Sequence, residues 1–476
     1  MRGYVEGVDR AQVTLFPDRL EDYVAGDNPV RVVDAFVEAL DLRDLHFVRA
    51  VPKSMGRPGY HPGTLLKLYI YGYLNRIHSS RRLEREAARN VELMWLTGRL
   101  VPDHKTIADF RRDNGGAIRK VCGQFVLLAR RLGLLKGAVV AIDGSKFKAV
   151  NNRDRNFTPA KMQRRLADIE AAIGRYLAEM DRSDTAEPDG QAKVERLEEK
   201  IAALRAHMAE LKAIDEQLRA APDGQVSLTD PDARSMNARG WGIVGYNVQA
   251  AVESEHHLIV AHEVVTTGSD RALLSPMASA AKAAMAAEQI EVVADRGYFS
   301  GPEVLACEEA GVRAHVVKPV TSNAEAAGRF GKRHFVDDPA TDSYRCPAGE
   351  TLPYRYTARE GEQAIRLYWA SVCETCRLKT DCTTGKERRV RRWEHEHVLE
   401  AMEKRLAQRP ELMTIRRSTV EHVFGTIKGW MGATHFLTRG KENVRTETSL
   451  QVLAYNLKRV INLLGTLPLM AAIKPT

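Results

Sequence analysis

The chain has 476 residues, of which 44% are hydrophobic, 28% charged and 7% aromatic. This composition is typical of a globular protein of several domains, and it excludes the disordered and fibrous classes. An excess of Lys and Arg (71) over Asp and Glu (62) gives a formal net charge of +9, which favours nucleic acid as a partner. No run of about 18 apolar residues occurs, and the first residues, MRGYVEGVDRAQ, lack the apolar core of a signal peptide, so we expect a cytoplasmic protein without membrane contact.

Residues 1–135 are expected to form a helical N-terminal domain that binds DNA. In HPGTLLKLYIYGYLNRIHSSRRLEREAARN, a Pro-Gly helix entry is followed by an apolar helix face, a Ser-Ser break and a basic helix, and VPDHKTIADFRRDN repeats this arrangement. A helix, a turn and a basic helix commonly present cations to a duplex. The alternative is that these cations lie on the solvent face of a scaffold helix. The candidate DNA contacts are Arg81, Arg82, Arg111 and Arg112.

Residues 136–320 are expected to form the first part of an α/β core. The segment GAVVAIDG is a short apolar run that ends in Asp143, and IEVVAD is a second that ends in Asp295. Both are typical of buried strands that place a carboxylate at their C-terminal ends. A β-hairpin and an Ala-rich helix between them complete the α/β pattern.

Residues 159–220, inside this core, are expected to form a helical hairpin. Apolar residues recur three and four positions apart in two stretches, and Pro188-Asp189-Gly190 between the stretches indicates a turn. The two helices should therefore fold back on each other in antiparallel fashion. A structural seam between the two helices is favoured over a coiled coil that joins two chains.

Residues 321–386 are expected to form a small cysteine-rich insertion. Four of the six cysteines gather here, whereas Cys122 and Cys307 stand alone. In a cytosolic chain such a group indicates a metal before disulfides, and four thiolates are the ligand number of a closed structural Zn²⁺ site. The alternative is four reduced thiols. The expected zinc ligands are Cys346, Cys373, Cys376 and Cys382.

Residues 387–476 are expected to complete the core with helices, one of which carries Glu421. If that helix packs over the two strands, Glu421 converges with Asp143 and Asp295. Converging carboxylates repel one another unless a cation lies between them, and their hard oxygens suit Mg²⁺ or Mn²⁺. Two such ions can hold both the attacking and the leaving oxygen of a phosphoryl transfer, which is nuclease or strand-transfer chemistry. The alternative for each single acid is a helix cap or an ion-pair partner.

Two further residues are candidates for contacts with DNA. Lys146 follows Asp143 closely, and such a cation is either solvated or bound to a phosphate. Trp430 can stack on an unpaired base, although a tryptophan next to Phe424 and Ile427 is more often part of a core.

The two strand-ending aspartates, the dipeptide Gly297-Tyr298 and the run RRSTVEHVFGTIKGWMG resemble the DDE transposases of bacterial insertion sequences. The resemblance continues in PDHKTIADFRR, GYNVQAAVE, LIVAHEVV, the cysteine-rich segment and ETSLQVLAYNLKRV. It therefore covers most of the chain outside the helical hairpin.

One broad group of these transposases carries the pattern Tyr-x2-Arg-x3-Glu-x6-Lys. Arg417, Glu421 and Lys428 fit its last three positions, and Thr414 stands where the tyrosine is expected. The resemblance implies that Asp143, Asp295 and Glu421 are the catalytic metal ligands. It also implies that Arg417 and Lys428 contact DNA phosphates.

The resemblance further implies a ribonuclease H-like mixed-sheet core and a two-metal-ion mechanism. One strand is hydrolysed at each element end, and the freed 3′-hydroxyl then attacks target DNA. The implied partners are the terminal inverted repeats, the target DNA and at least a second copy of the chain in the DNA complex, in a bacterial cytoplasm at the nucleoid. Two alternatives remain open, namely a DNA-binding protein without catalysis and a nuclease without strand transfer.

Overall fold

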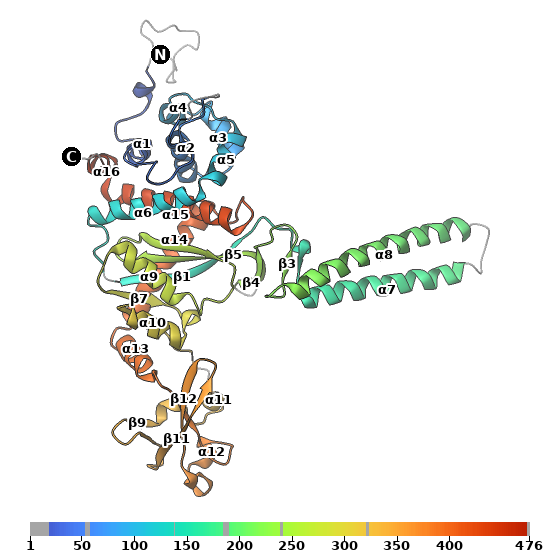
Figure 1. The fold of residues 1–476 in the computed structure, drawn as a ribbon, viewed down its shortest axis with the longest axis vertical. Helices are drawn as coiled ribbons and strands as arrows, with labels where there is room; N and C mark the ends of the chain where they lie inside the picture. The colour runs from blue at the N-terminus through green and yellow to red at the C-terminus, as the bar shows by residue number, and fades with distance from the viewer. Residues whose placement is uncertain are drawn as a thin grey trace, which may run out of the picture.

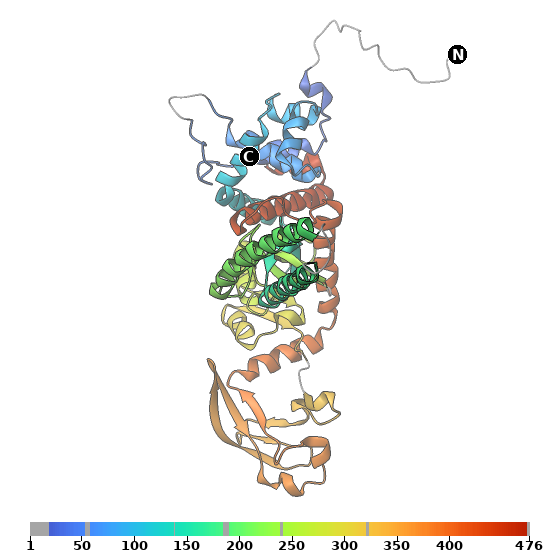
Figure 2. The same cartoon turned by 90° about the vertical axis from the view of Figure 1, so that its right-hand side faces the viewer.

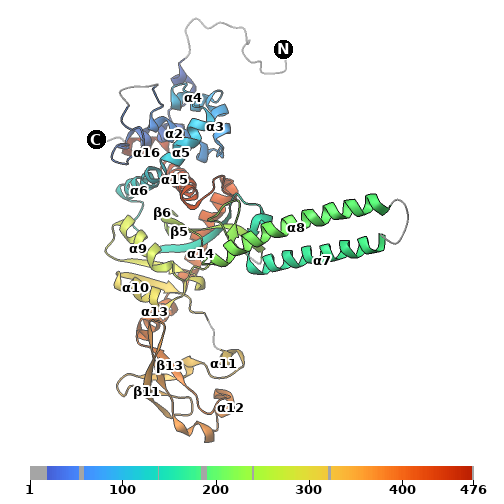
Figure 3. The ribbon, with the colours of Figure 1, turned by 45° about the vertical axis from the view of Figure 1, so that its right-hand side comes forward.

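The structure, a computed structural model, describes residues 19–52, 58–137, 139–183, 190–238, 241–319 and 323–473. It has a mixed α/β fold in which an N-terminal group of helices, a central sheet and a second sheet follow one another along the long axis (Figure 1). A pair of long helices projects sideways at the level of the central sheet (Figure 3). No helix in the described part of the chain is long and apolar enough to cross a membrane.

The N-terminal part is helical, as expected. Its second helix begins at the Pro-Gly entry, where the His61 ring accepts a hydrogen bond from the Gly63 amide at 3.2 Å, and nearly all of its residues are buried. Asp103 caps the fifth helix by accepting hydrogen bonds from two backbone amides. The elements are η1 (Leu20–Tyr23), α1 (Val30–Glu38), α2 (Pro62–Leu74), α3 (Ser80–Ala87), α4 (Val91–Thr97), α5 (His104–Asp113) and α6 (Gly115–Arg131).

The central sheet has the strand order β4-β5-β1-β7-β8, with β6 also paired to β5. Strand β5 runs antiparallel to β1, β4 and β6, whereas β1, β7 and β8 run parallel to one another. Helices cover the sheet, which explains why its central strands are continuous apolar runs. The strands are β1 (Val139–Lys148), β4 (Arg234–Ala238), β5 (Trp241–Glu253), β6 (Ile259–Val265), β7 (Ile290–Ala294) and β8 (Val312–Val316).

Asp143 does not end its strand, contrary to the sequence prediction. Strand β1 continues to Lys148 because its antiparallel pairing with β5 continues to Gly245. The parallel pairing of β1 with β7, however, stops at Ile142 opposite Ala294. Asp143 and Asp295 are therefore the first residues beyond the last parallel pair, and they lie at the same edge of the sheet.

The remaining helices around the central sheet come from both halves of the chain. The first group is α9 (Leu274–Met285), η3 (Arg296–Tyr298) and α10 (Gly301–Glu309). The C-terminal group is α13 (Glu396–Gln408), α14 (Glu411–Gly425), a π-helical segment η6 (Thr426–Trp430), α15 (Lys441–Leu464) and α16 (Thr466–Ile473).

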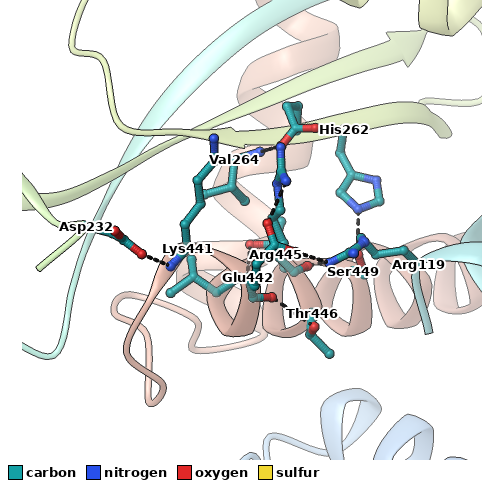
Figure 4. Close-up of polar contacts among 12 residues, drawn as sticks. Arg119, Asp232, His262, Val264, Lys441, Glu442, Arg445, Thr446 and Ser449 are labelled. Atoms are coloured by element: carbon teal, nitrogen blue, oxygen red, sulfur yellow. Dashed lines mark hydrogen bonds and ion pairs between the residues drawn. The ribbon is translucent and has the colours of Figure 1, made fainter. Parts of the chain in front are cut away.

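Helix α15 joins the N-terminal helices to the central sheet. It packs against α2 and α6 on one side and against β6 on the other, and most of its middle is buried. Figure 4 shows polar contacts that fasten it: His262 Nε2 on β6 lies 2.9 Å from Ser449 Oγ, and Arg119 on α6 forms an ion pair with Glu442 at 3.1 Å.

The inserted hairpin has the predicted form. Helices α7 (Pro159–Ser183) and α8 (Gly190–Ala220) lie side by side, and Figure 2 shows them in front of the central sheet. A buried seam includes Met162, Ile169 and Leu211, whereas Leu177 is 41% exposed. Residues 188 and 189 of the predicted turn lie outside the described residues. At the base are η2 (Arg153–Arg155) and a two-stranded sheet of β2 (Asn156–Phe157) and β3 (Val226–Ser227).

The cysteine-rich segment forms a second, antiparallel sheet with the order β13-β12-β11-β10-β9 and its own small core, which includes Phe335, Tyr344 and Tyr368. Its last strand lies beyond residue 386, where the segment was expected to end, because β13 pairs with β12. The strands are β9 (Val336–Asp338), β10 (Ser343–Arg345), β11 (Thr351–Glu360), β12 (Gln363–Tyr368) and β13 (Val390–Trp393). The short helices are α11 (Asn323–Ala326), η4 (Lys332–His334), η5 (Ser371–Thr375) and α12 (Lys379–Cys382).

Candidate active site

The carboxylates of Asp143 on β1 and Asp295 after β7 both face the guanidinium group of Arg416. Arg416 Nη2 on α14 lies 2.9 Å from Asp143 Oδ2 and 3.7 Å from Asp295 Oδ2. The other oxygen of each carboxylate is held by the backbone: Oδ1 of Asp143 accepts from the Gly144 amide and Oδ1 of Asp295 from the Gly297 amide, both at 2.8 Å. The fold therefore orients the two carboxylates toward one centre of positive charge.

Burial raises the pKa of Asp143 to about 6. The Arg416 guanidinium and the Gly144 amide act in the opposite direction, and the neighbouring carboxylates of Asp295 and Asp270 raise the pKa further. Removing a carboxylate from water disfavours its charge unless a cation is close. This environment consequently favours bound positive charge at the edge of β1 and β7.

The sequence analysis missed Asp270, in the loop between β6 and α9. Its Oδ1 accepts hydrogen bonds from Asn247 Nδ2 at 2.7 Å and from Gln249 Nε2 at 2.8 Å, and its Oδ2 lies 3.8 Å from Lys146 Nζ. In the sequence this residue stands in Gly-Ser-Asp before a helix, which is typical of a turn or a cap. Its place in the loop that follows a strand of the same sheet is the feature from which it could have been predicted as a site residue.

Glu421 lies on α14 between Arg416, which contacts Asp143, and Phe424, which packs on Phe147 of β1. It is exposed, and among the described residues it forms no hydrogen bond or ion pair. The carboxylates of Asp143, Asp295 and Glu421 do not all lie within 4.8 Å of one another. The structure thus turns the two aspartates toward Arg416, and Glu421 does not complete a close group of three ligand atoms with them.

Among the described residues, three possible ligand atoms within 4.8 Å of one another occur at the turn between β5 and β6. They belong to Glu253, Glu255 and His256. Both oxygens of the buried Glu253 accept backbone hydrogen bonds, from the Glu255 amide at 2.6 Å and the His256 amide at 2.7 Å. These bonds explain Glu253 as the residue that holds the turn. Its strand position opposite Val140 separates it from Asp143.

Two of the predicted DNA contacts lie on the helix that covers the site. Lys428 Nζ, in the π-helical segment, donates to Ser145 Oγ at 2.7 Å and to the Lys146 carbonyl at 2.8 Å. Arg417 is exposed on α14. Lys428 thereby ties the end of α14 to β1 close after Asp143.

The N-terminal arginines differ in their surroundings. Arg81 and Arg82 are exposed on α3, and neither forms an ion pair within the described ranges. Arg112 is exposed but pairs with two aspartates of its own helix. Arg111 packs inward, with its guanidinium 5.7 Å from the centre of the Tyr69 ring, so it is not oriented toward solvent as a duplex contact requires.

Trp430 is not a core residue, because 64% of it is exposed. Two cations from other elements lie over its ring, Arg76 at 5.5 Å and Lys458 at 4.3 Å from the ring centre. An exposed aromatic ring between cations is a surface on which a nucleic-acid base can stack.

The four clustered cysteines line one cavity of about 30 Å³ in the second sheet region. That volume is close to the share of one water molecule in the liquid, so a single ion fits. Burial raises the pKa of Cys382, and the other three cysteines raise it further, which places the four thiols near one another. No three of their sulfurs lie within 4.8 Å of one another. The sulfur-to-sulfur distances in this structure are therefore longer than those between the ligands of a bound ion. The donor set, four thiols around a space for one ion, fits zinc.

Comparisons with known proteins match both ends of the chain. The family described as "Transposase domain (DUF772)" matches residues 18–113, and the family described as "Transposase DDE domain" matches residues 345–461. The second range contains Glu421 and Lys428, whereas Asp143 and Asp295 lie outside both ranges.

Two further comparisons add little. No curated protein matches the sequence. A solved piggyBac transposase, in a synaptic complex with hairpin DNA, has 8% identity and a TM-score of 0.32 over 94% of this chain and 78% of that chain, which does not establish a shared fold. The two domain matches agree with the resemblance drawn from the sequence and support a DDE transposase.

Proposed function

We propose that this transposase cleaves DNA at the ends of its mobile element and joins the freed 3′-hydroxyl to target DNA, with Asp143, Asp295 and Glu421 as the metal ligands. One observation carries the proposal: two carboxylates beyond the last parallel pair of β1 and β7 face a single cationic centre at 2.9 and 3.7 Å. Their hard oxygens suit Mg²⁺ or Mn²⁺.

We assign the following roles to residues of the chain. Asp143 and Asp295 would hold the divalent ions, and Glu421 on α14 would supply the third carboxylate. Such ions, when bound, activate the attacking oxygen and neutralise the leaving oxygen of an in-line phosphoryl transfer. Arg417 and Lys428 hold the phosphate backbone by charge-assisted hydrogen bonds. No covalent intermediate with the protein is required.

The DNA would lie across α14 and the N-terminal helices. Arg81 and Arg82 supply exposed cations on α3, Lys146 lies beside the site, and Trp430 offers a base-stacking surface. The inward packing of Arg111 and the ion pairs of Arg112 favour a smaller role for these two residues.

The finer architecture is also part of this proposal. The strand order β6-β5-β1-β7-β8, antiparallel in its first half and parallel in its second, supports a ribonuclease H-like core. We place its parts in residues 136–320 and 387–476, the DNA-binding helices in residues 1–135, and a zinc-binding insertion in residues 321–386. Since two element ends must be paired, a dimer or a larger assembly acts on DNA in a bacterial cytoplasm at the nucleoid.

A cleavage assay tests the function. The purified chain is incubated with Mg²⁺ and a labelled duplex that carries its own element end. We expect cleavage by wild type and by Asp154→Ala, an exposed aspartate paired with Arg165 at the base of the hairpin. Asp143→Ala, Asp295→Ala and Glu421→Ala should each lose cleavage while they still bind the duplex.

The outcomes separate the possible functions. Normal cleavage by one of the three variants would remove that residue from the ligand set. Binding without cleavage by wild type would instead indicate a DNA-binding protein without catalysis. Cleavage without joined products would indicate a nuclease.

A further inference from the structure

We propose that Asp270 is a ligand of the divalent cation in the same site as Asp143 and Asp295. This inference rests on the proposed function, because it takes the site to hold a cation. It adds a carboxylate that lies outside both matched family ranges and outside the set predicted from the sequence.

The three aspartates share one arrangement. In each, Oδ1 is held by N–H donors: one backbone amide for Asp143 and one for Asp295, and two side-chain amides for Asp270. In each, Oδ2 faces a cationic side chain, Arg416 for the first two and Lys146 for Asp270. A carboxylate that is fixed through one oxygen and presents the other to positive charge is prepared to bind a cation.

Two glycines allow Asp270 to approach the other aspartates. A Cβ atom on Gly144, next to Asp143, would lie 3.0 Å from Asp270 Oδ1. A Cβ atom on Gly297 would lie 2.9 Å from Asp295 Oδ1 and 3.9 Å from Asp270 Oδ2. The carboxylate of Asp270 therefore lies against the two backbone segments that hold the other two carboxylates. The oxygens of the three aspartates, like those of the set with Glu421, do not all lie within 4.8 Å of one another, so a bound cation would draw them closer together.

Asn247 supplies an independent observation. It is fully buried, its amide nitrogen donates to Asp270, and its carbonyl oxygen has no hydrogen-bond partner among the described residues. That oxygen lies on the Asp270 side of β1, 2.9 Å from the position of a Cβ on Gly144. A buried carbonyl oxygen without a donor is costly. A cation or its bound water at this place would satisfy it.

A second contact fixes Asp270 relative to Asp295. The buried Tyr298, in the turn η3 that begins after Asp295, donates its hydroxyl hydrogen to Gln249 Oε1, and Gln249 Nε2 donates to Asp270. One glutamine on β5 thus links the loop of Asp270 to the turn of Asp295. Lys146 Nζ forms an ion pair with Asp270 Oδ2 at 3.8 Å, which is too long for a hydrogen bond, so the amide donors of Asn247 and Gln249 hold the carboxylate in position.

Mn²⁺ binding to the full chain without DNA tests the inference, read by electron paramagnetic resonance of free Mn²⁺. Wild type should bind saturably, and both Asp270→Asn and Asp143→Asn should weaken the affinity about 10- to 100-fold. The matched control is Asp232→Asn, an aspartate beside the same sheet that accepts a hydrogen bond from the Lys441 amide at 2.8 Å, and it should bind as wild type does. Circular dichroism without metal establishes that each variant is folded.

A measurement on the wild-type chain removes any dependence on folding of the variant. Fe²⁺ with ascorbate and peroxide cuts a backbone close to the bound ion, and we expect cuts near residues 143, 270 and 295. Absence of cuts near residue 270, or an Mn²⁺ affinity unchanged in folded Asp270→Asn, would overturn the inference and leave the proposed function intact. Dependence of Mn²⁺ binding on Asp270 in a chain that cleaves no DNA would overturn the proposed function alone. A wild type that binds no Mn²⁺ would overturn both.

Discussion

Gly144 leaves the space in which side chains from two other segments approach β1. A Cβ at this position would lie 2.2 Å from Gln249 Nε2 and 2.9 Å from Asn247 Oδ1, which is far inside van der Waals contact. Neither group can withdraw without breaking its hydrogen bond to Asp270. The residue directly after Asp143 is therefore restricted to glycine by its neighbours.

Gly144→Ala is predicted to displace this hydrogen-bonded group. Overpacking of this kind costs about 1–3 kcal/mol. We expect a lower melting temperature together with loss of Mn²⁺ binding and of DNA cleavage. Gly242→Ala is the matched control, since a Cβ on that glycine of β5 has no atom within 4 Å. Unaltered Mn²⁺ affinity in Gly144→Ala would contradict the proposed geometry.

His262, between β6 and α15, gives a pH dependence of stability. Burial lowers its pKa to about 4, against an ordinary value of about 6.5. Between these two values the unfolded chain binds a proton that the folded chain does not, so the folded state loses stability as the pH falls from about 6.5 to 4. The loss is at most about 3.5 kcal/mol, since one pKa unit corresponds to about 1.4 kcal/mol.

The measurement compares wild type with His262→Gln by thermal unfolding at pH 7 and pH 5. The difference in melting temperature between the two should decrease at pH 5, because only wild type carries the destabilising titration. His397→Gln, at an exposed histidine, should follow wild type at both pH values. Parallel curves for wild type and His262→Gln would refute the assignment.

At the scale of elements, α14 and the π-helical segment that follows it form the cover of the site. Arg416 near the middle of α14 contacts Asp143, and Lys428 in the π-helical segment contacts Ser145. Short π-helical segments within or after α-helices occur often at functional sites. These two elements therefore bring positive charge to Asp143 and Ser145, two alternate positions of β1, and α14 also carries Glu421 and Arg417.

The second sheet is the other element with a chemical prediction. Cys373→Ser should lower the zinc content of the purified chain below one ion per chain and lower its melting temperature, because a four-thiolate site contributes folding free energy. Cys122→Ala, at a buried cysteine of α6 far from the cavity, should keep its zinc. Equal zinc content in wild type and Cys373→Ser would leave four reduced thiols as the explanation.

At the scale of the whole molecule, α15 links the N-terminal helices to the central sheet, because it packs against α2 and α6 as well as against β6. Its buried Glu447 accepts hydrogen bonds from the Leu437 and Thr438 amides and from the Thr438 hydroxyl, the last at 2.7 Å. Burial raises the pKa of this carboxyl. The residue thus holds the turn before α15 in place from inside the molecule.

Glu447→Ala should destabilise the chain by about 1–3 kcal/mol, since it removes the buried acceptor of three hydrogen bonds from Leu437 and Thr438. Glu442→Ala, one turn earlier on an exposed side of the same helix, should cost about 1 kcal/mol or less, because its ion pairs with Arg119 and Arg445 are exposed. Calorimetry measures both. Equal losses in the two variants would show that burial of Glu447 does not stabilise the link between the two parts.

Local patterns in the sequence determined a large part of this protein. Apolar runs identified β1 and β7 with their aspartates, the Pro-Gly entry located α2, and apolar residues three and four positions apart identified α7 and α8. The cysteine cluster identified the second sheet region as a metal candidate. These features depend on neighbours in the chain, whose periodicity and turn chemistry are readable from the residues alone.

Tertiary structure alone decided which side chains meet. The register of β1 with β5 extends the strand past Asp143, and the loop after β6 places Asp270, which stands 127 positions after Asp143 and 25 before Asp295 in the sequence, near this pair. Stacking on Tyr69 turns Arg111 inward, although its position on a basic helix predicts exposure. Contacts between distant segments depend on strand register and packing, which no local spacing encodes. The sequence by itself therefore determined the elements and the class of chemistry, and the packing of those elements decided the membership of the site.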